Sequence, residues 1–316
     1  ICCLQHKHFN KVVKINNKMP NWIYFVLTAN LIWSFTSLID KIVISKGHIK
    51  NPLVYILTNG LMNVLLILFL PFVSFKSLNF MDFLIALFSG AAFVAALAFY
   101  YKAVEHDEIS KVIILFQLGP IFVLALSYIF LGEILTKNNF IGFLLLLTAG
   151  LLVSYKRIKN SFKLSKAFSL MLISTFFSAI ALVTSKHIFN VTSFWSAFLW
   201  LRLVEFIAVG VLLVPSIRKE AVDTYKSMTP KIKILIIFKM VIDFSAFVFS
   251  GYAINNGLIS LVTALGSSAL PLFVFFLAMI TSIYFPNIVK EEIDKKTILT
   301  KVFAIILIIV GIGLVS

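Results

Sequence analysis

Four ionisable residues stand inside long apolar runs, at spacings that place each pair on one face of a helix. Arg202 and Glu205 are three residues apart, and Lys239 and Asp243 are four residues apart, so the side chains of each pair are able to meet. A charge at the centre of a bilayer costs about 2.5–3.5 kcal/mol on insertion scales, so such residues face a partner or a cavity. Two interpretations stay open: each pair neutralises itself, or it binds a charged solute.

A stripe of polar residues follows one face of the first apolar run. Asn30, Ser34, Ser37 and Lys41 recur at helical spacing, and Asp40 lies beside them. A helix that faced only lipid would not carry such a stripe. We therefore expect it to line a central cavity between helices.

The predicted substrate-binding residues carry one positive charge in excess, with four cations against three carboxylates. This excess favours a substrate with at least one anionic group. Lys41 and Lys186 lie near helix ends, however, and would cancel the excess if they extended to the membrane surface instead. The full set is Asn30, Ser34, Ser37, Asp40, Lys41, Asn59, Gln117, Lys186, Arg202, Glu205, Lys239 and Asp243.

The sequence contains no arrangement of residues that would support catalysis. A Ser/His/Asp set, an HExxH motif and a GxxxxGK[ST] nucleotide-binding loop are all absent. The two cysteines, Cys2 and Cys3, are adjacent and do not have the spacing of metal ligands. We therefore predict a protein that is not an enzyme and that needs no metal or cofactor.

The composition is that of a membrane protein built from helices. Of the 316 residues, 60% are hydrophobic and 13% are charged, against about 25% charged residues in soluble domains. The apolar runs are about 20 residues long, enough for a helix to cross a bilayer, and the alternating pattern of β-barrel strands is absent. The net charge of +15 comes mostly from Lys and Arg between these runs, which argues against nucleic-acid binding and for membrane topology signals.

Apolar runs and their Gly and Pro breakers predict ten transmembrane helices. Lys and Arg gather in the loops after the odd-numbered helices, which predicts that those loops are cytoplasmic and that both termini lie outside. The basic residues of the N-terminal tail favour the opposite orientation. The loops are too short to hold a soluble domain. The predicted helices are 22–44, 52–72, 80–103, 109–131, 138–155, 167–189, 194–214, 232–254, 258–285 and 297–315.

The two halves of the sequence resemble each other. The segment FYYKAVEHDEIS at 99–110 aligns with FSGYAINNGLIS at 249–260, Pro120 with Pro271, and Lys41 with Lys186. An odd number of helices in each repeat forces the second copy to lie inverted in the bilayer, as in many secondary transporters. We therefore predict an all-α membrane protein in which ten transmembrane helices form two inverted five-helix repeats.

The fourth and fifth predicted helices carry a motif of proline, Leu-Gly-Glu and spaced glycines that resembles the signature of the EamA family in the drug/metabolite transporter superfamily. We expect the proline to kink its helix and the glycines to let helices approach closely. Glu133 is expected to pair with Lys137 at the interface, with direct substrate contact as the alternative. The motif residues are Pro120, Gly132, Glu133, Gly142 and Gly150, with Pro271 and Gly311 in the second half.

The second half departs from this pattern, because Glu292 or Asp294 stands where the family has one Glu. The resemblance otherwise covers both halves and divides the chain into segments. These segments are a basic N-terminal tail (1–21), a first EamA-like repeat (22–155), a basic linker loop (156–166) and a second EamA-like repeat (167–316).

These features predict a secondary-active transporter, a permease that moves an amino acid or another small anionic or zwitterionic metabolite by alternating access. A passive channel and an intramembrane enzyme are the alternatives. The expected partners are the solute, the lipid bilayer and a coupling ion such as a proton, without nucleic acid and with the protein as a monomer or homodimer. The expected location is the bacterial cytoplasmic (inner) membrane.

The basic tail is interpreted as an upstream extension that the working protein does not need. No apolar run precedes Met19, so nothing before it spans the bilayer. A chain that starts at Met19 should therefore insert and transport like the full chain, as measured by membrane fractionation and by solute uptake. Loss of insertion in the shortened chain would contradict this interpretation.

Overall fold

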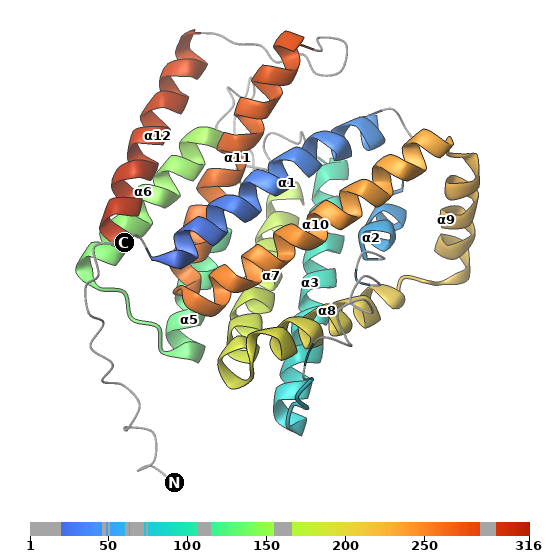
Figure 1. Ribbon diagram of the computed structural model, residues 1–316, viewed down its shortest axis with the longest axis horizontal. Coiled ribbons are helices and arrows are strands. Elements are labelled where there is room, and N and C mark those ends of the chain that lie inside the picture. The colour runs from blue at the N-terminus through green and yellow to red at the C-terminus, as the bar shows by residue number, and fades with distance from the viewer. Residues whose placement is uncertain are drawn as a thin grey trace.

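A computed structural model describes residues 20–45, 49, 51–60, 63, 73, 75–106, 115–154, 166–284 and 295–316. Every regular element within these residues is an α-helix (Figure 1), which confirms the predicted all-α class. The helices are α1 (Asn21–Ser45), α2 (Pro52–Gly60), α3 (Phe80–His106), α5 (Gly119–Leu131), α6 (Lys137–Ser154), α7 (Lys166–Val191), α8 (Phe194–Gly210), α9 (Pro215–Ser227), α10 (Pro230–Asn256), α11 (Ile259–Tyr284) and α12 (Lys295–Val315).

Ten of these helices overlap the ten predicted spans in whole or in part, but fewer have the length and composition to cross a membrane. Six described helices meet both conditions, or seven if α8 and α9 count as one span bent by 101°. α5 has 13 residues, and α2 covers only the first part of its predicted span, most of the rest of which lies outside the described residues. Ten transmembrane helices therefore stay a prediction.

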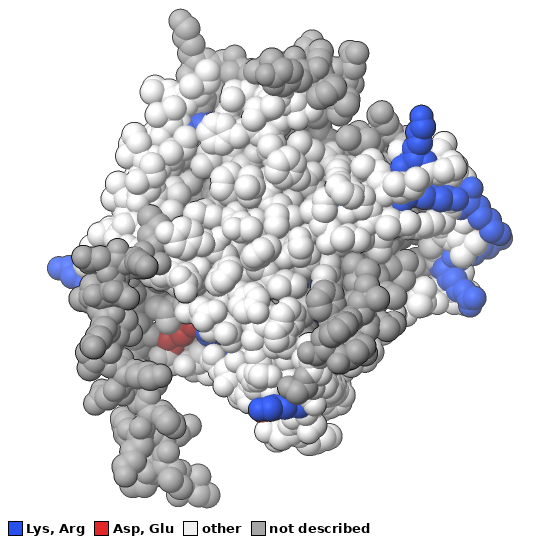
Figure 2. Space-filling view, viewed as in Figure 1, with Lys and Arg blue, Asp and Glu red and all other residues white. Residues whose placement is uncertain are grey.

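The predicted helices 194–214 and 232–254 leave a connection between them that was expected to be a loop. This prediction is wrong over most of the connection, because residues 215–227 form α9. Pro215 stands at the start of this helix, where a missing backbone N–H has no cost. The helix has no buried residue and carries several charged side chains, so its sequence contains no apolar run. Figure 2 shows Lys and Arg atoms gathered over α9 at the right-hand edge of a mostly uncharged surface.

The helices pack in two matching sets. α1 packs against α10 and α11, while α7, its equivalent in the second predicted repeat, packs against α3 and α5. Equivalent helices α6 and α12 lie side by side and antiparallel (Figure 1), because Gly142 is close to Gly311 at one end and Lys301 contacts Val153 at the other. The end of the bundle with Glu133 and the start of α1 is called the Glu133 face, and the opposite end is the Lys301 face.

Two motif glycines meet where α6 crosses α12. A Cβ atom at Gly142 would lie 3.0 Å from the carbonyl oxygen of Gly311, and one at Gly311 would lie 3.0 Å from Cγ of Leu146. Small residues of this kind let membrane helices approach until their backbones touch. The close approach predicted from the motif is present.

Proline and glycine set the two ends of α5. The expected kink within 109–131 is a break instead, because α5 begins at Gly119 with Pro120 in its first turn. A turn at residues 117–118 precedes it. At the other end Gly132 adopts φ 66°, a left-handed conformation that ends the helix. The chain then turns so that Glu133 points toward α11.

A single added methyl group should test the close packing of α3 against α8. A Cβ atom at Gly90 would lie 2.8 Å from the carbonyl oxygen of Val204, a backbone atom that cannot rotate away. Gly90→Ala should therefore lower the free energy of unfolding by about 1–3 kcal/mol, measured as thermal unfolding in detergent. Gly313→Ala is the matched control, because its Cβ would meet nothing within 4 Å. Equal stability of the two variants would contradict the packing.

Candidate functional site

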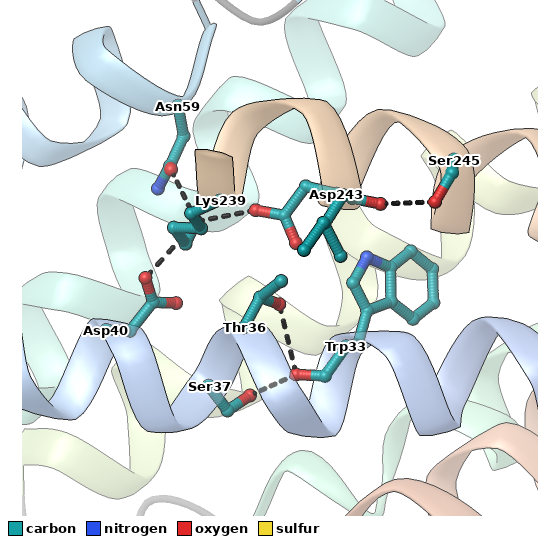
Figure 3. A network of polar contacts seen from close by, with 9 residues as sticks. Trp33, Thr36, Ser37, Asp40, Asn59, Lys239, Asp243 and Ser245 are labelled. Atoms are coloured by element: carbon teal, nitrogen blue, oxygen red, sulfur yellow. Dashed lines mark hydrogen bonds and ion pairs between the residues drawn. The ribbon is translucent and has the colours of Figure 1, made fainter. Parts of the chain in front are cut away.

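Lys239 on α10 joins three helices through one ammonium group (Figure 3). Its Nζ donates to Asp243 Oδ2 on the same helix at 2.6 Å and to Asn59 Oδ1 on α2 at 2.8 Å. Asp40 Oδ1 on α1 lies 3.2 Å from the same nitrogen. The predicted pair of Lys239 with Asp243 therefore forms, and it extends to two residues of the first half that had been assigned to the site separately.

This cluster contains one cation and two carboxylates. The side chains of Lys239 and Asp243 are 6% and 10% exposed, whereas Asp40 is 28% exposed. Asp40 Oδ1 has no hydrogen bond from the described residues, although the ammonium is near. With one negative charge in excess among the described side chains, the cluster is suited to receive a proton or the ammonium group of a solute.

The predicted pair on α8 also forms. Arg202 Nη2 donates to Glu205 Oε1 at 2.5 Å, and the guanidinium lies 4.4 Å from the ring centroid of Phe247. Both members of the pair are buried, and the Nε and Nη1 atoms of Arg202 have no hydrogen-bond partner among the described residues. Glu205 lines a cavity. The pair thus neutralises itself and also exposes its carboxylate to the interior.

Two adjoining cavities lie inside the bundle, with volumes of about 660 Å³ and 250 Å³. They adjoin because Ser37, Phe93, Leu97 and Leu270 line both. The smaller cavity holds the charged groups Asp40, Glu205, Lys239 and Asp243 with Asn59. The larger one is lined by hydroxyl, amide and aromatic side chains together with Pro271 and one lysine; its polar and aromatic residues include Tyr100, Phe116, Gln117, Ser154, Ser174, Ser178, Ser267, Phe275 and Lys301.

Among the described residues that line the larger cavity, Lys301 is the one with a charged side chain. It was not among the predicted substrate-binding residues. It stands in the second turn of α12, where it contacts the carbonyl oxygen of Val153 on α6 and lies 5.1 Å from the ring centroid of Phe275. It follows a run of charged residues in the sequence, which hides it among the basic residues between helices. Its position within the predicted helix 297–315 was the signal that would have identified it.

Gln117 bridges the two halves of the chain next to the larger cavity. Its Nε2 donates to Ser154 Oγ at 2.9 Å and to the carbonyl oxygen of Ser267 at 3.2 Å. The turn before Pro120 exposes this side chain to the interior. Gly150 makes room for it, because a Cβ at that position would lie 2.6 Å from Gln117 Oε1.

The polar stripe of α1 reaches the cavities only in part. Ser37 lines both cavities. Asn30 and Ser34 are buried and donate to the carbonyls of Val26 and Leu31 in their own helix. The side chain of Lys41, the last member of the stripe, lies outside the described residues.

Lys186 and Glu133 lie away from both cavities. Lys186 donates to backbone carbonyl groups at the end of α10. Glu133 accepts hydrogen bonds at the start of α11. The expected pair with Lys137 is not among the ion pairs of the described residues, and Lys137 is exposed.

No group of three or more metal-ligating side chains occurs in the described part of the chain.

Removal of the shared cation should destabilise the protein. Lys239→Met leaves Asp40 and Asp243 without their counter-charge, which should lower the free energy of unfolding by about 3–5 kcal/mol. Thermal unfolding in detergent measures the loss. Lys231→Met on the same helix is the control, because Lys231 is exposed.

A triple variant separates charge from packing at this cluster. Adding Asp40→Asn and Asp243→Asn to Lys239→Met removes the uncompensated carboxylates, so most of the lost stability should return. If Lys239→Met unfolds at the same temperature as the parent, the cluster does not hold these helices together.

Comparison with known proteins supports the membrane interpretation. The model of the EamA-like transporter family, which belongs to the drug/metabolite transporter superfamily, matches residues 20–155. No curated protein matches the chain. One protein of known crystal structure shares the fold, with a TM-score of 0.65 and 15% sequence identity over 93% of this chain and 96% of the other. The chain is thus a multi-pass integral membrane protein, and its residues 20–155 are similar to the EamA-like transporter family.

Proposed function

We propose that this protein is a secondary-active transporter that carries a small zwitterionic or anionic metabolite across the membrane by alternating access. The observation that carries the proposal is the pair of adjoining cavities inside the bundle, whose polar lining comes from helices of both halves. Charged and polar side chains inside an apolar membrane bundle cost stability, and such residues usually have a function. A permeation site is the function that fits the family.

The charges of the two cavities support a solute with two opposite charges. The larger cavity carries Lys301, which suits a carboxylate or phosphate, and the smaller one carries the excess carboxylate of the Lys239 cluster, which suits an ammonium group. Their volumes lie within or just below the usual range for small-molecule sites, about 300–1,000 Å³. An amino acid meets both requirements, and Tyr100, Phe116 and Phe275 offer contacts for an apolar side chain.

The directions of equivalent helices support two inverted repeats. α6 and α12 are antiparallel, and the end of α5 lies beside the start of α11. Likewise α1 starts beside the α10–α11 corner, where α7 ends. Repeats related by an axis along the membrane normal would place equivalent helices parallel instead. An inverted pair provides two related conformations, one open to each side.

The basic residues support one orientation. α9 follows the end of α8 at the Lys301 face and carries Arg218, Lys219 and Lys226 (Figure 2). Such residues are enriched on the cytoplasmic side. The Lys301 face is therefore assigned to the cytoplasm of a bacterial inner membrane, and the Glu133 face to the outside.

Two other functions compete with this proposal. A passive channel would conduct without saturation and would not accumulate solute, and an intramembrane enzyme would need reactive groups in the cavities.

The excess carboxylate near Asp40 favours a carrier that binds and releases a proton as its coupling ion. We propose a monomer or homodimer as the working unit.

Transport by purified protein in liposomes tests the function directly. Uptake of a panel of amino acids and phosphorylated metabolites, with and without an inward proton gradient, should reveal a solute that accumulates against its gradient and saturates. Linear flux without accumulation would favour a channel and contradict the proposal.

A charge variant then tests the site. Lys301→Met should raise the half-saturating concentration about tenfold or more, because loss of a charge-assisted hydrogen bond weakens binding by roughly 1.5–3 kcal/mol. Lys226→Met on α9 is the control, because it removes an exposed charge away from the cavities. An unchanged half-saturating concentration in Lys301→Met would remove Lys301 from the site.

A further inference from the structure

The corner between α10 and α11 is held by two charged side chains from other helices. Lys186 of α7 donates to the carbonyl oxygens of Ile254, Asn255 and Gly257 at 2.7, 3.0 and 3.0 Å. Glu133, just after α5, accepts from the backbone N–H of Ile259 at 3.0 Å and contacts Ser260 Oγ at 3.4 Å.

The two charges match the two helix ends that they contact. The last carbonyl groups of a helix carry partial negative charge and lack partners within the helix, so an ammonium group stabilises them. The first N–H groups of a helix carry partial positive charge, and a carboxylate stabilises these. The ammonium group of Lys186 donates its three hydrogen bonds at the end of α10. The carboxylate of Glu133 accepts hydrogen bonds at the start of α11.

This corner lies at the Glu133 face, where the bundle is closely packed. A Cβ atom at Gly257 would lie 2.9 Å from Cγ of Trp22, so the corner packs directly against the start of α1. At the same face the starting turn of α3 is joined to the end of α7, because Asp82 lies 2.8 Å from His187. The cavities instead extend toward Lys301 at the opposite face.

We infer that Lys186 and Glu133 act as positioning residues that hold the Glu133-face gate of the transporter closed, and that the gate opens when these contacts break. The inference rests on the proposed function and adds the identity of its gate. The two residues come from α7 and from the end of α5, whereas the corner belongs to α10 and α11. Relative movement of these helices therefore has to separate the charges from the corner.

The chemistry of these contacts suits a reversible gate. Each is a hydrogen bond between a charged side chain and backbone or hydroxyl groups near the membrane surface. When the gate opens, water reaches the ammonium group, the carboxylate and the exposed backbone groups, and replaces the lost hydrogen bonds.

Cysteine reactivity in nanodiscs tests the gate without knowledge of the solute. In a background with Cys2→Ser and Cys3→Ser, one reporter is Asn30→Cys, at a buried position on the Glu133 side of α1. The other is Ser37→Cys, which lines both cavities. The probe is a membrane-impermeant maleimide, and each reporter is combined with Lys186→Met, Glu133→Gln or the control Lys137→Met.

The expected result is a reciprocal change. Lys186→Met and Glu133→Gln should each raise the reaction rate at position 30 at least fivefold and lower the rate at position 37, because the open population shifts from the Lys301 face to the Glu133 face. Lys137→Met, which removes an exposed charge four residues from Glu133, should change neither rate. Lys186→Arg keeps a charged donor and should stay near the parent.

Any other pattern overturns the inference. Increased rates at both positions would indicate general loosening, and unchanged rates at both would show that the contacts do not hold a gate. If Lys186→Met does not fold, Glu133→Gln decides the question alone. A reciprocal change together with no solute accumulation in liposomes would leave the gate in place and reject the proposed transport, so the two failures are distinguishable.

Discussion

The rest of the structure depends on the ammonium group of Lys239, because this one group joins two helices of the first half, α1 and α2, to α10 of the second half. It contacts Asp243 in its own helix and reaches Asp40 and Asn59 in the first half. A buried ion pair adds little stability compared with apolar packing, whereas breaking one is costly. Here a second carboxylate shares the cation, so the cluster holds the helices together and keeps one negative charge in excess for a proton or a solute.

The motif residues shape the bundle around this cluster, and most of them do not line a cavity. Pro120 starts α5 and leaves Gln117 in a turn that faces the interior, and Gly150 makes room for that amide. Gly132 ends α5 so that Glu133 reaches α11. Their common effect is to bring helices of the two halves into direct contact, which is the condition for a site built from both.

Periodicity alone predicts much of this arrangement. The helix positions and the two charge pairs follow from local spacing, because residues three and four apart always share a helix face. Contacts between distant helices do not follow from spacing. The approach of Asp40 to Lys239 and the contact of Lys186 with the end of α10 depend on how helices pack. Lys301 was missed because it follows a charged loop, and α9 because it has no apolar run.

The central claim is that one buried site is exposed to the two faces in turn, and pulsed electron paramagnetic resonance tests it most directly. Spin labels at the exposed positions Lys102 and Ile298 report the Lys301 face, and labels at Lys137 and Asn256 report the Glu133 face. The solute identified by uptake is added to protein in nanodiscs. Alternating access predicts that the 102–298 distance shortens in the same population of molecules in which the 137–256 distance lengthens. Distances that stay unchanged at both faces during active transport would contradict it.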